Sequence, residues 1–224
     1  MPRTQTGIGR ESLRPGWHRE AVGGLWDEVG TLQRDFMIAR GLRPEHRLLD
    51  VGCGSLRGGI RFIEYLDAGN YVGVDRDPEL LEAGRVELAE AGLESKGTTL
   101  VHDEHFRFGH IGGRFDYALA QSLFTHLPLN SVMVCLLGVE AVLREGGTFY
   151  ATFFERPQGT RGLGAIEHER ADGPAIRTRP DADPYHYGFD AFEWICEPTR
   201  LEPRYIGEWG HPRGQRMLAF VRRG

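Results

Sequence analysis

Apolar and polar residues alternate with two different periods along this chain. Between residues 17 and 41 the apolar positions return every three or four residues, which predicts one N-terminal helix. Compact apolar runs at residues 47–51 and 71–75 predict short buried strands. Helical and strand patterns then alternate, which favours a doubly wound, mostly parallel α/β sheet.

Five further strands and four further helices complete this pattern. The strands are expected at residues 98–102, 115–121, 148–154, 204–208 and 217–221, and the helices at about 57–66, 78–88, 130–143 and 189–196. A short GHPRGQ connection joins the last two strands and leaves no room for a crossover helix. The predicted sheet therefore has seven strands and ends in an antiparallel hairpin.

One polar segment interrupts the alternation. Residues 155–184 are rich in Gly, Pro and Arg, and the segment is too long for an ordinary connection, which predicts a lid or mobile loop. The expected organisation is an N-terminal arm and helical cap over residues 1–41, followed by one domain over residues 42–224 with a lid insertion at about 155–187.

The charge composition disfavours large anionic partners. The 224 residues include 27 Lys and Arg against 32 Asp and Glu, a formal charge of −5, so no overall field attracts nucleic acid or an anionic membrane. A small molecule is the expected partner. The tail at residues 199–224 is a local exception, because its six arginines against two glutamates could hold an acidic group or form a solvated face.

The cysteines and the N-terminal residues indicate the cellular compartment of the protein. Cys53, Cys135 and Cys196 form no CxxC pair, so neither a disulfide framework nor a zinc ribbon is indicated. The sequence has no run of about 18 apolar residues, and residues 1–16 lack the apolar centre of a signal peptide. We therefore expect a cytoplasmic protein.

A glycine-rich turn, Asp50-Val51-Gly52-Cys53-Gly54, follows the first strand and opens a helix. Residues without side chains let backbone amides close on a ligand at this edge of the sheet. Asp75 ends the second strand 21 residues after Gly54, where a carboxylate can accept hydrogen bonds from both ribose hydroxyls. The two features predict a nucleoside cofactor. A dinucleotide stays open here, although the GxGxxxG spacing and the closing hairpin disfavour it.

Four stretches of the sequence carry a family resemblance. LLDVGCGSLRGG, YVGVD, FDYALAQSLFTHL and VLREGGTFYATFF closely resemble the class I S-adenosylmethionine-dependent methyltransferases, and the hairpin with WGHPRGQRML fits their last two strands. The resemblance covers about residues 41–222 and implies a Rossmann-like fold. It is strongest to small methyltransferases of bacterial natural-product pathways, and it implies S-adenosyl-L-methionine (SAM) as cofactor and S-adenosyl-L-homocysteine (SAH) as product.

The resemblance also implies roles for residues along the carboxyl edge of the sheet. The methionine end of the cofactor would lie on Asp50 and the backbone of Gly52, Cys53 and Gly54. The ribose would bind Asp75, the nucleoside would lie between Arg76 and Leu80, and the adenine amino group would be read by Asp103 and Glu104. Phe106 could stack on the base or belong to the core. The floor beneath the sulfonium would be Gln121, Ser122 and Leu123, with a helix cap as the alternative for Ser122.

Motifs that are missing narrow the chemistry. Family members that methylate amino groups of nucleobases or glutamine have [DN]PP[YF] after the fourth strand, where this chain has QSLF. Metal-dependent catechol-type relatives have an acidic ligand there, and this chain has Gln121. We therefore expect metal-free transfer to a hydroxyl oxygen of a small molecule, with a small-molecule nitrogen as the alternative. A non-catalytic partner protein, a nicotinamide dehydrogenase and an RNA methyltransferase are less favoured.

His126 is the expected catalytic base, because it lies five residues past Gln121 and imidazole accepts protons near neutral pH. A capping or packing histidine is the competing interpretation. Other residues that could contact the substrate are Trp26, Tyr185, His186, Tyr187 and His211. The expected partners are a small-molecule acceptor, no nucleic acid and no membrane, and a homodimer is left open.

Overall fold

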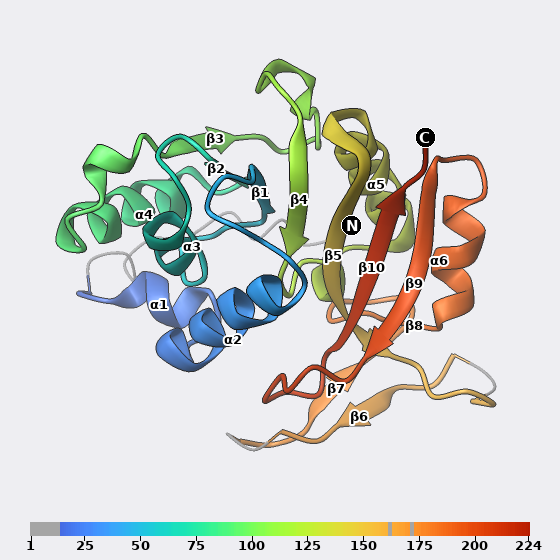
Figure 1. Cartoon of the computed structure of the whole chain (residues 1–224). Helices are drawn as coiled ribbons and strands as arrows, with labels where there is room; N and C mark the ends of the chain where they lie inside the picture. Colours follow the sequence, from blue (N-terminus) through green and yellow to red (C-terminus); the bar gives the residue numbers. More distant parts are fainter. Residues whose placement is uncertain (1–13, 161–162, 171–172) are drawn as a thin grey trace.

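A central sheet organises the protein in the computed structural model, which describes residues 14–160, 163–170 and 173–224. Its strands are β1 Leu48–Val51, β2 Tyr71–Asp75, β3 Thr99–His102, β4 Phe115–Ala120, β5 Leu143–Glu155, β8 His186–Tyr187, β9 Leu201–Gly207 and β10 Arg216–Arg222. Seven of them follow the order β3-β2-β1-β4-β5-β10-β9, and β8 pairs with the end of β5 (Figure 1).

The strand directions confirm the predicted fold class. The strands β1 to β5 are parallel to one another, whereas β10 is antiparallel to both β5 and β9. The C-terminal hairpin is therefore present as expected, and the short β8 adds an eighth strand that the sequence pattern did not reveal.

Helices cover both faces of the sheet. On one face lie α2 Trp26–Ala39, α3 Gly59–Tyr65 and α4 Pro78–Glu90, whose Met37, Phe62 and Leu81 share one buried cluster. On the other lie α5 Leu129–Val142 and α6 Phe189–Cys196, whose Val132 and Phe192 belong to a second cluster. Among the described residues, three 3₁₀ turns complete the connections: η2 Glu94–Lys96, η3 Phe108–His110 and η4 Phe124–His126. None of the helices in the described ranges is long and apolar enough to cross a membrane.

The prediction of a single N-terminal helix over residues 17–41 is wrong, because the structure has two helices there. α1 Trp17–Ala21 ends before Gly23 and Gly24, and the chain restarts as α2 after Leu25, whose φ is 48°. Arg57 donates to the carbonyl oxygens on both sides of Gly23, at 2.7 and 3.0 Å. Arg213 donates to the Gly23 carbonyl at 2.6 Å. Helical hydrogen bonding here is thus replaced by contacts from distant arginines, which periodicity cannot reveal.

The segment predicted as a lid contains structure of its own. β6 Ile166–His168 and β7 Ile176–Thr178 form an antiparallel pair, and the chain then returns to β5 through β8. Figure 1 shows this hairpin and the α1–α2 unit at the same edge of the sheet, where β4 ends. The segment after β5 is therefore more than a simple loop, and both additions border the place where a ligand would enter.

Candidate active site

A cavity of about 650 Å³ opens at the carboxyl ends of β1, β2 and β4. The strand order reverses between β1 and β4, which is where open α/β sheets form their ligand crevice. Every residue expected to hold the cofactor lines it, together with His126 and His211. These are Asp50, Gly52, Cys53, Gly54, Asp75, Arg76, Leu80, Asp103, Glu104, Phe106, Gln121, Ser122 and Leu123.

The glycine turn has a backbone that only glycine adopts easily. Gly52 and Gly54 have φ values of 75° and 54°. A Cβ atom on Gly54 would lie 2.6 Å from Val22 Cγ1, so the α1–α2 connection closes directly over the turn. The amides of Gly52 and Cys53 donate to the Val74 carbonyl, which fixes the turn to β2.

Asp75 connects the end of β2 to this turn. Its Oδ2 accepts a hydrogen bond from the Gly54 amide at 2.8 Å, and its Oδ1 accepts one from the Asp77 amide at 2.9 Å. Burial raises the pKa of Asp75, and the two amides oppose the rise. An ionised carboxylate has about four acceptor positions, so both oxygens can still accept ligand hydroxyls.

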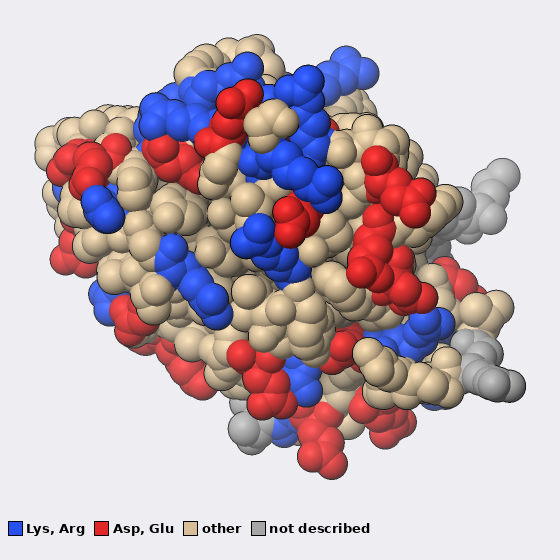
Figure 2. All heavy atoms as spheres, turned by 45° about the vertical axis from the view of Figure 1, so that its right-hand side comes forward, with Lys and Arg blue, Asp and Glu red and all other residues tan. Residues whose placement is uncertain are grey.

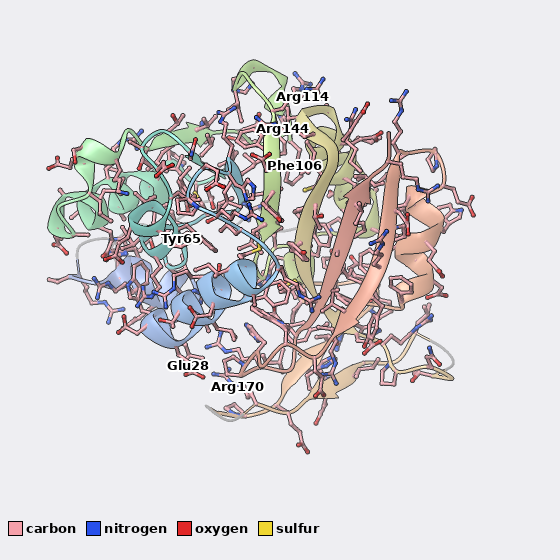
Figure 3. All side chains as sticks on the ribbon, in the orientation of Figure 1. Glu28, Tyr65, Phe106, Arg114, Arg144 and Arg170 are labelled. Carbon is pink, nitrogen blue, oxygen red and sulfur yellow. The ribbon has the colours of Figure 1, made fainter. Side chains whose placement is uncertain are left out.

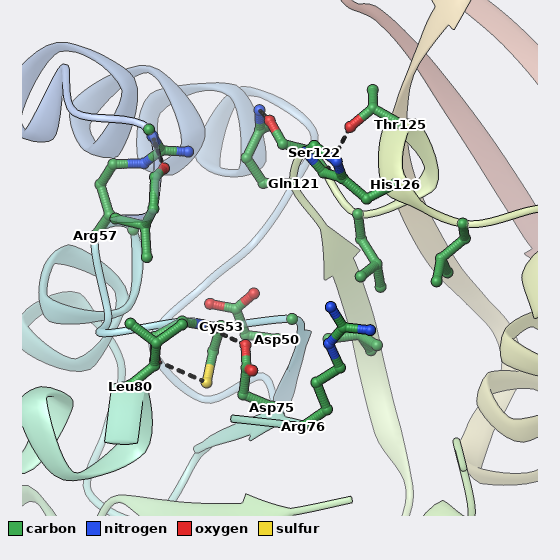
Figure 4. Close-up of a pocket in the computed structure, with 18 of the residues that line it drawn as sticks. Asp50, Cys53, Arg57, Asp75, Arg76, Leu80, Gln121, Ser122, Thr125 and His126 are labelled. Carbon is green, nitrogen blue, oxygen red and sulfur yellow. Dashed lines mark hydrogen bonds between the residues drawn. The ribbon is translucent and has the colours of Figure 1, made fainter. Parts of the chain in front are cut away.

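Asp50 lies under the turn at the end of β1, beside Asp75 (Figure 4). The carboxylate is 4% exposed and accepts a hydrogen bond from the Tyr71 hydroxyl at 2.7 Å. Burial raises the pKa of Asp50 to about 6, because the charged form loses its hydration, although Tyr71 lowers it in part. A cationic ligand group would favour the charged form.

The connection after β3 brings further groups to the cavity. Asp103 accepts hydrogen bonds from the amides of His105 and Arg107, at 2.7 and 3.2 Å, and so shapes the loop. Phe106, labelled in Figure 3, has a φ of 57° and packs edge-on against Phe108 with ring centroids 6.2 Å apart. Phe106 therefore lines the cavity and contacts the core at once.

The end of β4 carries a network of polar side chains. Ser122 has a φ of 58°, an unusual conformation for a residue other than glycine. Its amide donates to Thr152 Oγ1 at 2.7 Å, and its hydroxyl donates to Gln215 Oε1 at 3.1 Å. Gln121 donates from Nε2 to the Ser122 hydroxyl at 3.0 Å. Ser122 does not cap α5, whose N-cap residue is Pro128.

His126 pairs with a carboxylate that sequence analysis missed. Its Nδ1 lies 2.7 Å from Asp183 Oδ1, and the two side chains are 58% and 56% exposed. The insertion brings Asp183 here, because the Tyr185 amide donates to the Thr125 carbonyl at 2.7 Å and the Tyr187 hydroxyl donates to the Leu127 carbonyl. No local sequence signal links residues 57 positions apart.

Arg57 is a second residue that sequence analysis missed. It lines the cavity, is 8% exposed, and has a pKa lowered to about 10 by burial and by nearby Arg213. Its Nε is buried and has no hydrogen-bond partner within the described part of the chain. Its position inside the glycine cluster, between Gly54 and Gly58, is the sequence feature from which it could have been identified as a site residue.

Four residues expected at the substrate lie outside the lining of this cavity. Trp26 packs edge-on against His18 and under Arg19, whose Cζ is 4.8 Å from the ring centroid. His186 is buried and lies 2.8 Å from Thr178 Oγ1, and burial lowers its pKa. Tyr185 and Tyr187 stack on each other with centroids 6.3 Å apart. The backbone and packing contacts of these two tyrosines hold Asp183 in place.

The basic tail divides between surface and cavity. Arg204 and Arg223 contact Glu202, and Arg216 contacts Glu208 and Glu155. Figure 2 shows Lys and Arg side chains interspersed with acidic ones on this side of the molecule. Arg213 differs, because it lines the cavity. Three of the six tail arginines thus pair with glutamates, and Arg213 faces the cavity.

Comparison with known proteins agrees with this geometry. Residues 48–147 match the family model described as a methyltransferase domain. The ribosomal protein L11 methyltransferase of Ralstonia nicotianae is 31% identical over 157 residues, which cover 69% of this chain and 43% of that protein. The chain therefore matches less than half the length of that relative.

Solved structures of low sequence identity share the fold. An S-adenosylmethionine-dependent methyltransferase from Clostridium acetobutylicum superimposes with a TM-score of 0.65 at 12% identity, covering 92% of this chain and 95% of the other. SAM-bound CalS10, an amino pentose methyltransferase of calicheamicin biosynthesis from Micromonospora echinaspora, gives 0.64 at 17% identity, covering 91% and 94%. The fold that the resemblance implied is thereby confirmed.

Proposed function

We propose that this chain binds SAM and transfers the methyl group to a hydroxyl oxygen of a small molecule, without a metal ion. The match of residues 48–147 to a methyltransferase domain supports the proposal. One observation carries the proposal: Asp75, the glycine turn and His126 line the same cavity. A ribose-binding carboxylate and a proton acceptor would therefore share one space, of a size common for small-molecule sites.

The chain offers the groups that this cofactor needs. The free acceptor positions of Asp75 suit the two ribose hydroxyls, and the buried Asp50 suits the α-ammonium group. The buried guanidinium of Arg57 suits the carboxylate. The glycine turn would lie against the methionine end of the cofactor, while its own amides donate to Val74 and Asp75. When bound, SAM supplies an electrophilic methyl carbon on a positively charged sulfur.

Methyl transfer is an in-line displacement: the bond from the acceptor oxygen to the methyl carbon forms as the carbon–sulfur bond breaks. The hydroxyl proton must leave, and His126 would accept it at Nε2. Asp183 supports this role, because a carboxylate that accepts the Nδ1 hydrogen leaves the lone pair on Nε2 and stabilises the imidazolium that results. Alignment in the cavity would supply much of the remaining rate.

Nitrogen is the second candidate acceptor atom. CalS10 is named as an amino pentose methyltransferase, and the Ralstonia relative as a methyltransferase of ribosomal protein L11. A neutral amine attacks through its own lone pair, so a base would act only after transfer. Loss of His126 would then affect turnover less than it would for a hydroxyl. A non-catalytic partner protein would bind the cofactor and methylate no acceptor.

The proposal extends to location and assembly. Cys53, Cys135 and Cys196 are free and buried, which supports a compartment where thiols stay reduced, such as the cytoplasm. The proposed partner is the small-molecule acceptor. Sedimentation of the full chain would decide between a monomer and the homodimer that the sequence leaves open.

Calorimetry followed by a methylation screen tests the function. We expect binding of SAM and SAH and none of NAD. Methyl-labelled SAM should then label a hydroxylated small molecule equally with and without a chelator. Panels of amino sugars and purified ribosomal protein L11 separate the nitrogen alternatives. Binding of NAD in place of SAM would refute the cofactor assignment, and rescue of a chelated enzyme by magnesium would refute the metal-free one.

A further inference from the structure

Helix α5 is apolar on the side that it turns away from the sheet as well as on the side that it buries. Its inner side packs in the core through residues such as Val132 and Val139. Its outer side carries three exposed apolar side chains, Met133, Val134 and Leu137. A surface helix of a globular protein has a polar outer side, whereas a helix that is apolar all round is covered. The composition of α5 is therefore that of a helix with a partner on its outer side.

Helix α6, on the same face of the sheet as α5, extends this apolar surface (Figure 1). Trp194 of α6 is 64% exposed, although tryptophan is highly buried on average. A hollow of about 450 Å³ between the two helices is lined by Met133, Trp194, Ile195, Glu197 and Pro198. Exposed apolar side chains that adjoin one another mark interaction surfaces. We define the α5–α6 face as Met133, Val134, Leu137 and Trp194.

Different segments of the chain border α5 on its two flanks. Gly138 packs so closely on the carbonyl oxygen of Phe106 that a Cβ atom there would collide with it. Glu140 accepts a hydrogen bond from the amide of Arg200, just after α6, at 2.9 Å. Two residues along a helix correspond to a rotation of about 200°, so Gly138 and Glu140 point to opposite flanks. The segment around Phe106 therefore lies on one flank of α5, and α6 lies on the other.

The two flanks carry opposite charges. Arg107 follows Phe106 and is exposed, and Glu193 and Glu197 are exposed on and beside α6. Within the described part of the chain, none of these three side chains forms an ion pair. The surface thus has a positive flank, an apolar centre on α5 and a negative flank. A rotation of 180° about an axis through the centre exchanges the flanks, which is the complementarity that a two-fold interface requires.

We infer that the α5–α6 face is the interface of a two-fold symmetric homodimer, in which α5 packs antiparallel on α5 of a second copy and Arg107 faces Glu193 and Glu197 of that copy. The positions along α5 fit this arrangement. Phe106 meets α5 at Gly138, and Trp194 adjoins it at Met133, so an axis between these two levels carries one flank onto the other. No residue of the α5–α6 face lines the candidate active site, so both sites of the dimer stay open.

Sedimentation velocity of the full chain over a dilution series tests the interface. The wild type should sediment as a dimer that dissociates on dilution. Leu137→Asp places a charge at the apolar centre twice, once from each copy, and should weaken self-association at least about a hundredfold. Val86→Asp is the matched control, because Val86 is also an exposed apolar residue, 50% exposed, but lies on α4 on the opposite face of the sheet. This control should sediment like the wild type.

Charge reversal on the flanks tests the symmetry without changing the apolar centre. Arg107→Glu alone, or Glu193→Lys with Glu197→Lys, should weaken the dimer about three- to tenfold, because like charges then face each other. The chain with all three reversals should recover wild-type association, and a folding defect would not produce that recovery.

The outcomes that overturn the inference are distinct from a failure of the proposed function. A wild-type chain that stays monomeric would overturn it, and flotation of that monomer with phosphatidylglycerol vesicles would assign the α5–α6 face to a membrane instead. A dimer that Leu137→Asp leaves intact would place the interface elsewhere, and absence of recovery in the triple reversal would contradict the pairing of the flanks. A protein that dimerises but does not bind SAH would refute the proposed function alone.

Discussion

The carboxylate of Asp75 accepts a hydrogen bond from the backbone amide of Gly54 at 2.8 Å. One side chain thereby joins the end of β2 to the glycine turn that follows β1. Because the same carboxylate lines the cavity, the turn and the proposed ribose site form a single unit. A change at Asp75 should affect ligand binding more than a change at any surface carboxylate nearby.

Asp75→Ala should lower the affinity for SAM and SAH several-fold to about a hundredfold, since a charge-assisted hydrogen bond contributes about 1.5 to 3 kcal/mol. Calorimetry measures the effect. Asp77→Ala is the matched control: Asp77 caps α4 by accepting from the Glu79 amide at 2.9 Å, so its loss should reduce stability by about 1 kcal/mol and leave affinity unchanged. Wild-type affinity in Asp75→Ala would contradict the ribose assignment.

The affinity for SAM should depend on the charge of Asp50. The pKa of this carboxylate is raised to about 6, so its ionised fraction falls as the pH drops from 7 to 5. An α-ammonium group binds the ionised form, and affinity should therefore fall by up to about tenfold per pH unit below 6. Titrations at pH 5, 6, 7 and 8 measure this slope.

Asp50→Asn separates this effect from other titrating groups. The variant should bind SAM weakly with a flatter pH profile, because Asp75, whose pKa is also raised, would still titrate. The free protein should at the same time melt at a higher temperature near pH 7. The sign follows from the raised pKa: the stability cost of burying the charged form of Asp50 is full above about pH 6, shrinks as the pH falls below 6, and is gone below the ordinary value of 3.8. An unchanged pH slope in the variant would show that Asp50 is not the controlling group.

Local sequence pattern predicted the parallel strands and the glycine turn after β1 well, because buried strands and glycine turns are specified by neighbouring residues. The start of α4 at Pro78, the first residue of the predicted helix, is of this kind. The apolar periodicity did not reveal the break in the N-terminal helix, which lies at Gly23 and Gly24. Arg57 and Arg213 bind the carbonyl oxygens of this connection from distant parts of the chain. Asp183 was missed because contacts with residues 125–127 bring it to His126.

Ligand binding should protect the β6–β7 hairpin from proteolysis. Ile176 lines the cavity, and the next residue, Arg177, is exposed and open to trypsin. A segment that closes over a bound ligand would become less accessible. Trypsin digestion with saturating SAH should therefore cleave after Arg177 more slowly than digestion without it. Cleavage after the exposed Arg40, far along the chain from the insertion, provides the reference rate. Equal protection at both sites would indicate general stabilisation, and no protection would indicate a static hairpin.

His126 and Asp183 should act together on turnover and separately from cofactor binding. His126→Asn keeps a hydrogen-bonding side chain but removes the base, so kcat on a hydroxyl acceptor should fall about 10²–10⁴-fold while SAM affinity and melting temperature stay near wild type. Asp183→Asn should lower kcat to a smaller extent, because the imidazole loses the carboxylate that fixes its tautomer and stabilises its charged form. Nitrogen-15 NMR of the histidine ring should show the His126 tautomer shift in Asp183→Asn and remain unchanged in Asp181→Asn, a neighbouring exposed carboxylate. If His126→Asn has wild-type turnover, the His126–Asp183 pair is structural. Two explanations would then remain: the acceptor is an amine that needs no base, or the proton is taken by His211, which lines the same cavity.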